Sequence, residues 1–253
     1  MSIGDSITCI ELVNPERRNA LNDVLLEELI TALTEAATHS RAVILSAQTI
    51  SGVWCAGVDI SSLPIDGSVP DPATTPFDRA LAALRHLPVP IIAVVDGGAW
   101  GGGCNVALAC DLIVATTEAS FAITPAKLGV AYDPACIADF LAAMPVNLAR
   151  EMFFTAEPID ATRLEHLGVV NRLCESPTSA RDAAQSLAPT IASRAPLSLK
   201  SIKAEIAAQA SPHGITTDQG LRLRWREQAW ASADFREGRT AFAERRSPDF
   251  RGE

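Results

Sequence analysis

Apolar residues along the chain gather in short continuous runs with turn-forming residues between them. Such runs fit strands that are covered on both faces of a sheet, and they occur at 42–45, 91–95 and 112–115. Residues 7–13 mix β-branched residues with alternating polarity, which also predicts a strand, and Asn14-Pro15 should end it. The first half of the chain therefore predicts several strands, most of them buried.

Helical patterns separate these strands. Asn22 can cap a helix whose apolar stripe repeats at helical spacing from Leu25 to Leu33, and that stripe should face the core. Further helices are expected near 78–86 and 102–110. Strands that alternate with helices in this way predict an α/β fold built from repeated strand and helix units with right-handed crossovers.

Two segments depart from this alternation. Residues 63–76 hold four prolines among small polar residues, which predicts an irregular surface loop. After Pro145 the pattern turns helical, with long helical stretches expected at 180–193, 197–209 and 217–243. We therefore divide the chain into a core at 1–175 and a helical C-terminal region at 176–253.

Composition narrows the classes of function. The chain has 253 residues, 48% of them hydrophobic, and a formal net charge of -9, which repels polyanions and argues against nucleic-acid binding. No uncharged stretch approaches the length of a membrane span, and no basic-then-apolar leader opens the chain, so we expect a cytoplasmic protein. The six cysteines are scattered without a CxxC pair, which favours reduced core thiols and no metal site.

Two glycine-rich turns carry the first chemical signal. One is Cys55–Ile60, after an expected strand, and the other is Asp96–Gly103, which joins the strand at 91–95 to a helix. Glycine permits a close backbone approach, and a helix that begins near Gly102 points free N–H groups and its positive dipole end at its surroundings. Neither turn has the spacing of a phosphate loop or of the dinucleotide fingerprint. A ligand with an anionic oxygen fits these two turns best.

At this point the chain resembles the enoyl-CoA hydratase/isomerase family, also called the crotonase family. The resemblance covers nearly the whole chain, with five segments in family order. They are NPERRNAL at 14–21, CAGVDI at 55–60, PVPIIAVVDGGAWGGGCNVALACDLIVA at 88–115, FAITPAKLGV at 121–130 and FREGRTAFAERRSPDF at 235–250.

The resemblance implies a crotonase-like spiral of ββα units, a helical C-terminal region used for trimerisation, and an acyl-CoA substrate. It implies a homotrimer or a dimer of trimers, with no cofactor beyond the CoA moiety and no bound metal. The N–H groups of Val58 and Gly102 would form an oxyanion hole, which can stabilise a thioester enolate. Positions that meet CoA in relatives are matched here by Arg18, Ala20, Ala56, Gly57, Asp59, Ile60 and Arg245.

The reaction depends on residues near this oxyanion hole. Hydratases of the family carry two glutamates, and the matching positions here are Asn105 and Pro125, neither of which can take a proton. The string from Thr124 to Tyr132 instead looks like T-P-x-x-L-G-V-x-Y of the methylmalonyl-CoA decarboxylase branch, with the chain's only tyrosine at its end. The decarboxylase relative carries a histidine at the position of Val58. We expect decarboxylation of a malonyl-type thioester, with Thr124 and Tyr132 handling the carboxylate or the proton.

Two alternatives remain open. Asp133 stands where relatives that hydrolyse or displace thioester substrates carry a working aspartate, so a thioester hydrolase or another lyase or isomerase is the second interpretation. Asp133-Pro134 is also a plausible start of a helix. The third interpretation is a protein that binds acyl-CoA without turnover, which the retained glycines of both turns argue against.

Overall fold

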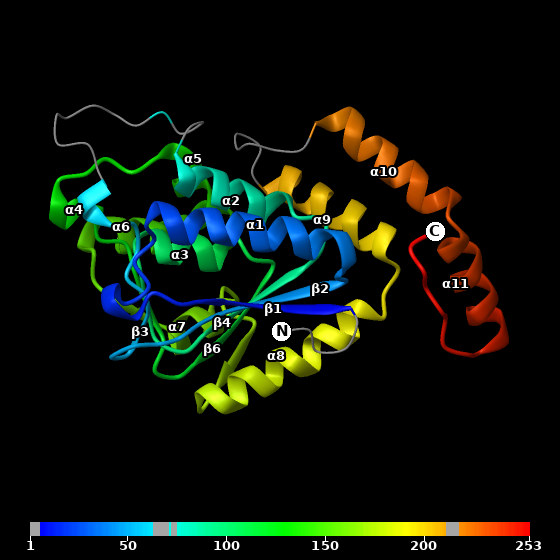
Figure 1. The fold of residues 1–253 in the computed structure, drawn as a ribbon, viewed down its shortest axis with the longest axis horizontal. Coiled ribbons are helices and arrows are strands. Elements are labelled where there is room, and N and C mark those ends of the chain that lie inside the picture. The colour runs from blue at the N-terminus through cyan, green and yellow to red at the C-terminus, as the bar shows by residue number, and fades with distance from the viewer. Residues whose placement is uncertain (1–5, 63–70, 72–74, 211–217) are drawn as a thin grey trace.

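The computed structural model describes residues 6–62, 71, 75–210 and 218–253 and contains two sheets (Figure 1). Five parallel strands form the larger sheet, in the order β1 (Ile7–Leu12), β2 (Ala42–Ala47), β4 (Ile91–Val95), β6 (Leu112–Thr116) and β9 (Arg172–Cys174). The smaller sheet has the order β3 (Val53–Cys55), β5 (Gly98–Trp100), β7 (Ser120–Ala122) and β8 (Ile159–Asp160), with β8 antiparallel to β7.

The expected ββα repeat is confirmed by the way the chain alternates between these sheets. Strands β2 and β3 are followed by helix α2 (Pro76–His86), and β4 and β5 by α3 (Gly102–Leu108). Each unit adds one strand to the larger sheet and the next to the smaller sheet, so that successive turns stack into a spiral. The second strand of each unit thereby delivers its following turn to one side of the molecule.

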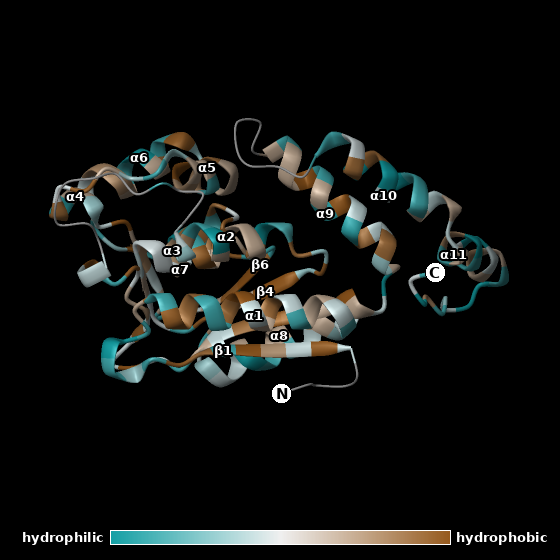
Figure 2. Ribbon diagram, turned by 45° about the horizontal axis from the view of Figure 1, so that its top comes forward, coloured by the Kyte–Doolittle hydropathy of each residue, from teal (hydrophilic) through white to brown (hydrophobic). Residues whose placement is uncertain are grey.

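The core lies between the larger sheet and the helices on its two faces. Helix α1 (Asp23–His39) is capped as expected, with Leu25 N donating to Asn22 Oδ1 at 2.9 Å, and its leucines are buried. Figure 2 shows β4 and β6 as hydrophobic almost throughout, which fits strands covered on both sides. On the opposite face, four alanines of α8 (Pro177–Ala192) pack against residues such as Ile92 and Val114. The expected boundary at residue 176 coincides with the cap of this helix and, as a domain boundary, stays a prediction.

Four helices form the end of the core beside the smaller sheet, and three more complete the chain. The first four are α4 (Pro125–Leu128), α5 (Pro134–Ala143), α6 (Val146–Thr155) and α7 (Ala161–His166). The last three are α9 (Pro196–Ala210), α10 (Gln219–Ala231) and α11 (Ala233–Glu244). The single helical stretch expected at 217–243 is interrupted, because Ser232 has extended backbone and its Oγ accepts from Phe235 N at 3.0 Å to begin α11. Most of the loop expected at 63–76 lies outside the described residues.

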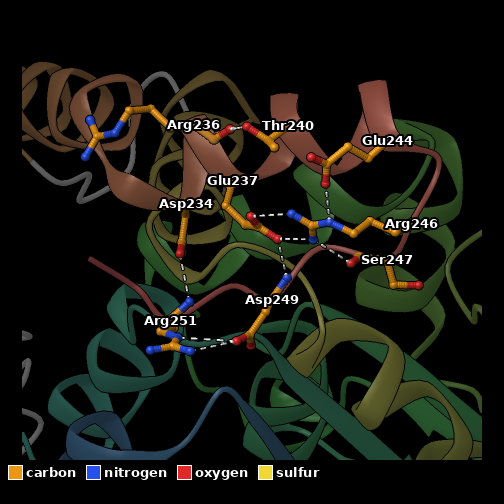
Figure 3. A network of polar contacts seen from close by, with 9 residues as sticks. All are labelled: Asp234, Arg236, Glu237, Thr240, Glu244, Arg246, Ser247, Asp249 and Arg251. Atoms are coloured by element: carbon orange, nitrogen blue, oxygen red, sulfur yellow. Dashed lines mark hydrogen bonds and ion pairs between the residues drawn. The ribbon is translucent and has the colours of Figure 1, made fainter.

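We call α10, α11 and the tail 245–253 the C-terminal arm. The tail folds back along α11 (Figure 3): the Asp234 carboxylate accepts from the backbone N–H groups of Arg251 and Gly252 at 2.7 and 2.8 Å. Glu237 accepts from both terminal nitrogens of Arg246 and from Asp249 N. The FREGRTAFAERRSPDF segment thus holds the tail on its helix. Across the described part of the chain, no helix is both long and apolar enough to cross a bilayer.

Candidate active site

The turn after β3 directs the backbone N–H of Val58 away from the neighbouring segment at Leu21. Leu21 and Val58 form an isolated parallel bridge, in which Leu21 N donates to Gly57 O at 2.8 Å and Asp59 N donates to Leu21 O at 3.2 Å. A parallel bridge of this kind uses the groups on either side of Val58 and turns the N–H of Val58 itself to the opposite side. Among the described residues no acceptor takes that N–H.

The two glycine-rich turns lie against each other. Gly57 has φ +87°, and a Cβ placed on it would lie 2.5 Å from Trp100 O and 3.3 Å from Gly102 N. A Cβ on Gly102 would lie 2.9 Å from the Cγ2 atom of Val58 and 2.9 Å from the Phe77 ring. The close approach therefore requires glycine at both positions. It brings the Val58 turn and the first turn of α3 together, as the sequence predicts.

Gly102 opens α3, and its N–H has no intrahelical acceptor because it belongs to the first turn. The residue before it, Gly101, has φ +51° and donates its own N–H to Ala122 O at 2.8 Å. Within the described chain no hydrogen bond uses the Gly102 N–H. Two backbone donors, on Val58 and Gly102, are therefore available in adjoining turns.

Thr124 stands beside these donors. Its Oγ1 lies 3.9 Å from the place that a Cβ on Gly101 would occupy, and the residue is partly exposed. Although Thr124 precedes α4, its side chain does not cap that helix. The hydroxyl is thus free of a capping hydrogen bond and can form one with a bound molecule. Pro125 occupies the first position of α4.

Tyr132 contacts α3 through Asn105. Its hydroxyl donates to Asn105 Oδ1, and its ring packs edge-on against Phe153 with 5.2 Å between ring centroids. Burial of the hydroxyl raises the pKa of Tyr132 well above its ordinary value. Asn105 follows Gly102 by three residues on α3, so the Tyr132 hydroxyl is joined, through Asn105, to the helix that Gly102 opens. The structure therefore brings Val58, Gly102, Thr124 and Tyr132 into one neighbourhood.

Asn105 is fully buried and links Tyr132 to an ion pair. Its Nδ2 donates to Cys136 O at 3.0 Å and to Asp139 Oδ2 at 2.9 Å. Asp139 in turn accepts from Arg85 Nε at 2.9 Å and from a terminal nitrogen of Arg85 at 2.5 Å, a bidentate pair with little exposure. Burial raises the pKa of Asp139, against the lowering effect of Arg85.

Asp133 acts on the backbone of its own helix. It caps α5, and its Oδ1 accepts from Ala135 N at 2.7 Å and from Cys136 N at 3.4 Å. Among the described residues, Asp133, Asp78 and Cys136 could together offer three ligand atoms to a metal ion, within 4.8 Å of one another. Burial raises the pKa of the Cys136 thiol to about 12, so this thiol is protonated near neutral pH and is a poor ligand.

Most residues expected to meet CoA surround the Val58 turn. Arg18 O accepts from Ala56 N at 3.0 Å, which ties the exposed turn after η1 (Pro15–Arg17) to this segment. Ala20 lies in the same segment, directly before the bridge at Leu21.

The Asp59 carboxylate accepts from the Ser61 hydroxyl at 2.7 Å and from Ser61 N at 3.0 Å. These hydrogen bonds, the hydroxyl first, lower the pKa of Asp59. Ile60 begins the short helix η2 (Ile60–Ser62) and is 59% exposed.

Arg245 is not brought to this site within one chain. It ends α11, with φ +55°, and its backbone N–H is used to cap that helix. Helix α11 lies at the opposite end of the molecule from β3 and the Val58 turn (Figure 1). Arg18 and Arg245 therefore lie far apart within one chain, and the expectation that each meets CoA stays a prediction. The motif around Arg245 instead folds the tail onto α11.

Two asparagines of the site region were not recognised from the sequence as organising residues. Asn19 is buried with φ +56°, and its Nδ2 donates to Gln48 O and to Trp54 O, both at 2.9 Å. This side chain ties the segment before Leu21 to the strands behind the Val58 turn. Asn105 was considered only as the replacement of a glutamate. For Asn105 the signal was an asparagine inside an otherwise apolar stretch, because a buried amide needs partners. Asn19 follows two arginines, and no such signal marks it.

Comparison with known proteins agrees with this arrangement. The family model described as enoyl-CoA hydratase/isomerase matches residues 2–253. The methylmalonyl-CoA decarboxylase of Escherichia coli (strain K12) is 32% identical over 250 residues, which cover 98% of this chain and 95% of that protein. A probable enoyl-CoA hydratase of Mycobacterium bovis (strain ATCC BAA-935 / AF2122/97) is also 32% identical, over 255 residues that cover 98% of this chain and 97% of that one.

A solved structure gives the same result at the level of the fold. Methylmalonyl-CoA decarboxylase in complex with 2-nitronate-propionyl-CoA superposes with a TM-score of 0.80 at 31% identity. The match covers 100% of this chain and 97% of that chain. The ββα spiral with its helical C-terminal region is thus the crotonase fold. The chain belongs to the enoyl-CoA hydratase/isomerase family.

Proposed function

We propose that the protein is an acyl-CoA decarboxylase that acts on a malonyl-type thioester, in a reaction of the methylmalonyl-CoA to propionyl-CoA type. Relatives named as decarboxylase and as hydratase are equally similar, so the residues of the site must decide between them. The observation that carries the proposal is the state of Asn105. Its amide is fully used by Tyr132, Cys136 and Asp139, so no group there can deprotonate a water. With Pro125 at the second hydratase position, water addition lacks both carboxylates.

Decarboxylation needs no general base. The bond between the carboxylate carbon and the α-carbon breaks, CO2 leaves, and the electron pair of that bond becomes the thioester enolate. The N–H groups of Val58 and Gly102 would donate to the enolate oxygen, and preorganised donors of this kind stabilise such a charge by several kcal/mol. Thr124 would orient the departing carboxylate through its uncommitted hydroxyl. A proton delivered to the α-carbon then completes the product.

The experiment that tests this proposal incubates the purified protein with methylmalonyl-CoA, malonyl-CoA, crotonyl-CoA and β-hydroxyisobutyryl-CoA in separate reactions. Mass spectrometry should show loss of CO2 from one or both malonyl-type thioesters. Hydration of crotonyl-CoA without loss of CO2 elsewhere would contradict the proposal.

The alternative with a specific residue behind it is thioester hydrolysis through Asp133. In that case free CoA should appear, and Asp133→Asn should abolish it while Tyr132→Phe leaves it intact. For the decarboxylase we expect the reverse pattern. If neither substitution changes the activity, the assignment of the site is wrong. If the thioesters stay unchanged in all four reactions, the result favours a protein that binds acyl-CoA without turnover.

We further propose that the substrate is an acyl-CoA that needs no additional cofactor, and that the protein forms a homotrimer or a dimer of trimers. The C-terminal arm supports self-association, because Trp230 is 63% and Phe242 87% exposed in the single chain. Light scattering should give a mass of three or six chains, and Phe242→Arg should shift it toward the single chain. The cytoplasmic location stays a prediction.

A further inference from the structure

The amide of Asn105 has only one chemically acceptable orientation. Both of its Nδ2 protons have acceptors, Cys136 O at 3.0 Å and Asp139 Oδ2 at 2.9 Å. Turning the amide over would place Oδ1 against a carbonyl oxygen and a carboxylate oxygen, which cannot donate. Both Asp139 oxygens accept from the Arg85 guanidinium, which leaves Oδ2 an acceptor toward Asn105. The ion pair therefore fixes Oδ1 of Asn105 toward Tyr132.

That orientation also decides what Tyr132 can do. An amide oxygen only accepts, so Tyr132 must donate its single hydroxyl proton to Asn105. Only the lone pairs of the Tyr132 oxygen then remain for other partners. The Arg85–Asp139 pair fixes the orientation of the Asn105 amide, and that orientation fixes the direction in which the Tyr132 hydroxyl donates.

We propose that Asn105, oriented by Asp139 and Arg85, is a positioning residue that holds the Tyr132 hydroxyl as a hydrogen-bond acceptor toward the acyl group. This inference rests on the proposed decarboxylation and names the origin of its proton. A water molecule donates one O–H to the Tyr132 oxygen and transfers its other proton to the α-carbon of the enolate. The carbon–hydrogen bond forms as the water O–H bond breaks, and the hydroxide left behind takes a proton from solvent.

The opposite assignment, in which Tyr132 itself protonates the enolate, meets two obstacles. The proton would have to leave the Asn105 oxygen, and the resulting phenolate would face that oxygen, which has no proton to offer it. Burial also raises the pKa of Tyr132 well above its ordinary value, which makes the phenolate costly. The two assignments predict opposite effects when Asn105 is removed, because its loss frees the tyrosine proton to turn toward the acyl group.

A first experiment is independent of activity and uses the fact that Tyr132 is the only tyrosine. Protein labelled with tyrosine carrying carbon-13 at Cζ gives a single NMR signal that reports the hydrogen bond of the phenol. Asn105→Leu, which removes the acceptor, should move this signal, whereas Asn105→Gln, which keeps an amide with both donor and acceptor, should move it much less. Asn147→Leu, at an exposed position on α6, is the matched control and should not move it. Equal movement in Asn105→Leu and Asn105→Gln would overturn the proposal.

A second experiment is a double-mutant cycle on decarboxylation. Asn105→Leu should lower kcat by about tenfold and leave KM within about twofold, since Asn105 does not touch the substrate. In a Tyr132→Phe background the same substitution should cost less than about twofold. Asp139→Asn should follow the same pattern, with a loss of kcat in the wild-type background and little further loss beside Tyr132→Phe. An increase in kcat, or an equal loss with and without the Tyr132 hydroxyl, would overturn the proposal. A wild-type protein that releases no CO2 would refute the proposed function alone, and the NMR signal would still decide the role of Asn105.

Discussion

The candidate active site and the C-terminal arm are held together in opposite ways. At the site, glycines are pressed against their neighbours: a Cβ on Gly57, Gly102 or Gly103 would come within 3 Å of other atoms. In the arm, α10 has no buried residue, and the Glu237–Arg246 contacts are partly exposed to solvent. Close packing fixes positions to fractions of an ångström, whereas exposed ion pairs are screened and weak. One added carbon atom should therefore break the site, while the arm should tolerate most single changes.

The largest effect should come from Gly57→Ala. The new Cβ would meet Trp100 O, and φ +87° is unfavourable for alanine, so the Val58 turn must shift and its N–H must leave the proposed oxyanion hole. We expect kcat for decarboxylation of the malonyl-type thioester to fall by about 100- to 1000-fold, the range for removal of one such donor. Gly168→Ala is the matched control, because Gly168 has φ +77° but nothing within 4 Å of the new Cβ. Similar losses of activity in both variants would show that backbone strain, and not the contact with Trp100, is responsible.

Leucine truncation should separate the two regions by stability. Leu81 on α2 is fully buried, whereas Leu223 on α10 is 53% exposed. We expect Leu81→Ala to lower the free energy of unfolding by about 2–5 kcal/mol and Leu223→Ala to change it by less than about 0.5 kcal/mol. Urea unfolding followed by circular dichroism measures both. A large loss from Leu223→Ala would place Leu223, with Trp230 and Phe242, in the proposed contact between chains.

The sequence predicted the packed part of the molecule better than the arm. Runs such as 91–95 and the stripe of α1 carry strong periodic signals because burial selects apolar residues, and those elements were placed correctly. Strand β9 (Arg172–Cys174) was not anticipated, because three edge residues with one exposed arginine carry no such signal. The break at Ser232 was also missed, since its cause is a single hydroxyl that caps α11.

The site was predicted as a set of positions but not as a network. Spacing and resemblance placed Val58, Gly102, Thr124 and Tyr132, and the structure brings them together. The partners of Asn105 are Cys136 O and Asp139, which lie 31 and 34 residues further along the chain. Pairings at that distance depend on how α5 packs against α3, and nothing local in the sequence encodes them. The distance between Arg245 and the Val58 turn within one chain was not evident for the same reason, because motif order does not give distance in space.

The smallest effect concerns the ion pairs of the arm and their dependence on pH. Hydrogen bonds from Arg246 hold the pKa of Glu237 at about 2, below its ordinary value of 4.5. A carboxylate whose pKa is lower in the folded state stabilises the fold above the ordinary value, and this contribution is lost as the pH falls from 4.5 toward 2. Glu237→Gln should thus be slightly less stable than the wild type at pH 7, and the difference in urea midpoint should shrink below pH 4.5. Glu118→Gln, at an exposed carboxylate without an ion pair in the described chain, should show no such trend. A pH-independent difference for Glu237→Gln would mean that its backbone contact with Asp249, and not its charge, holds the tail.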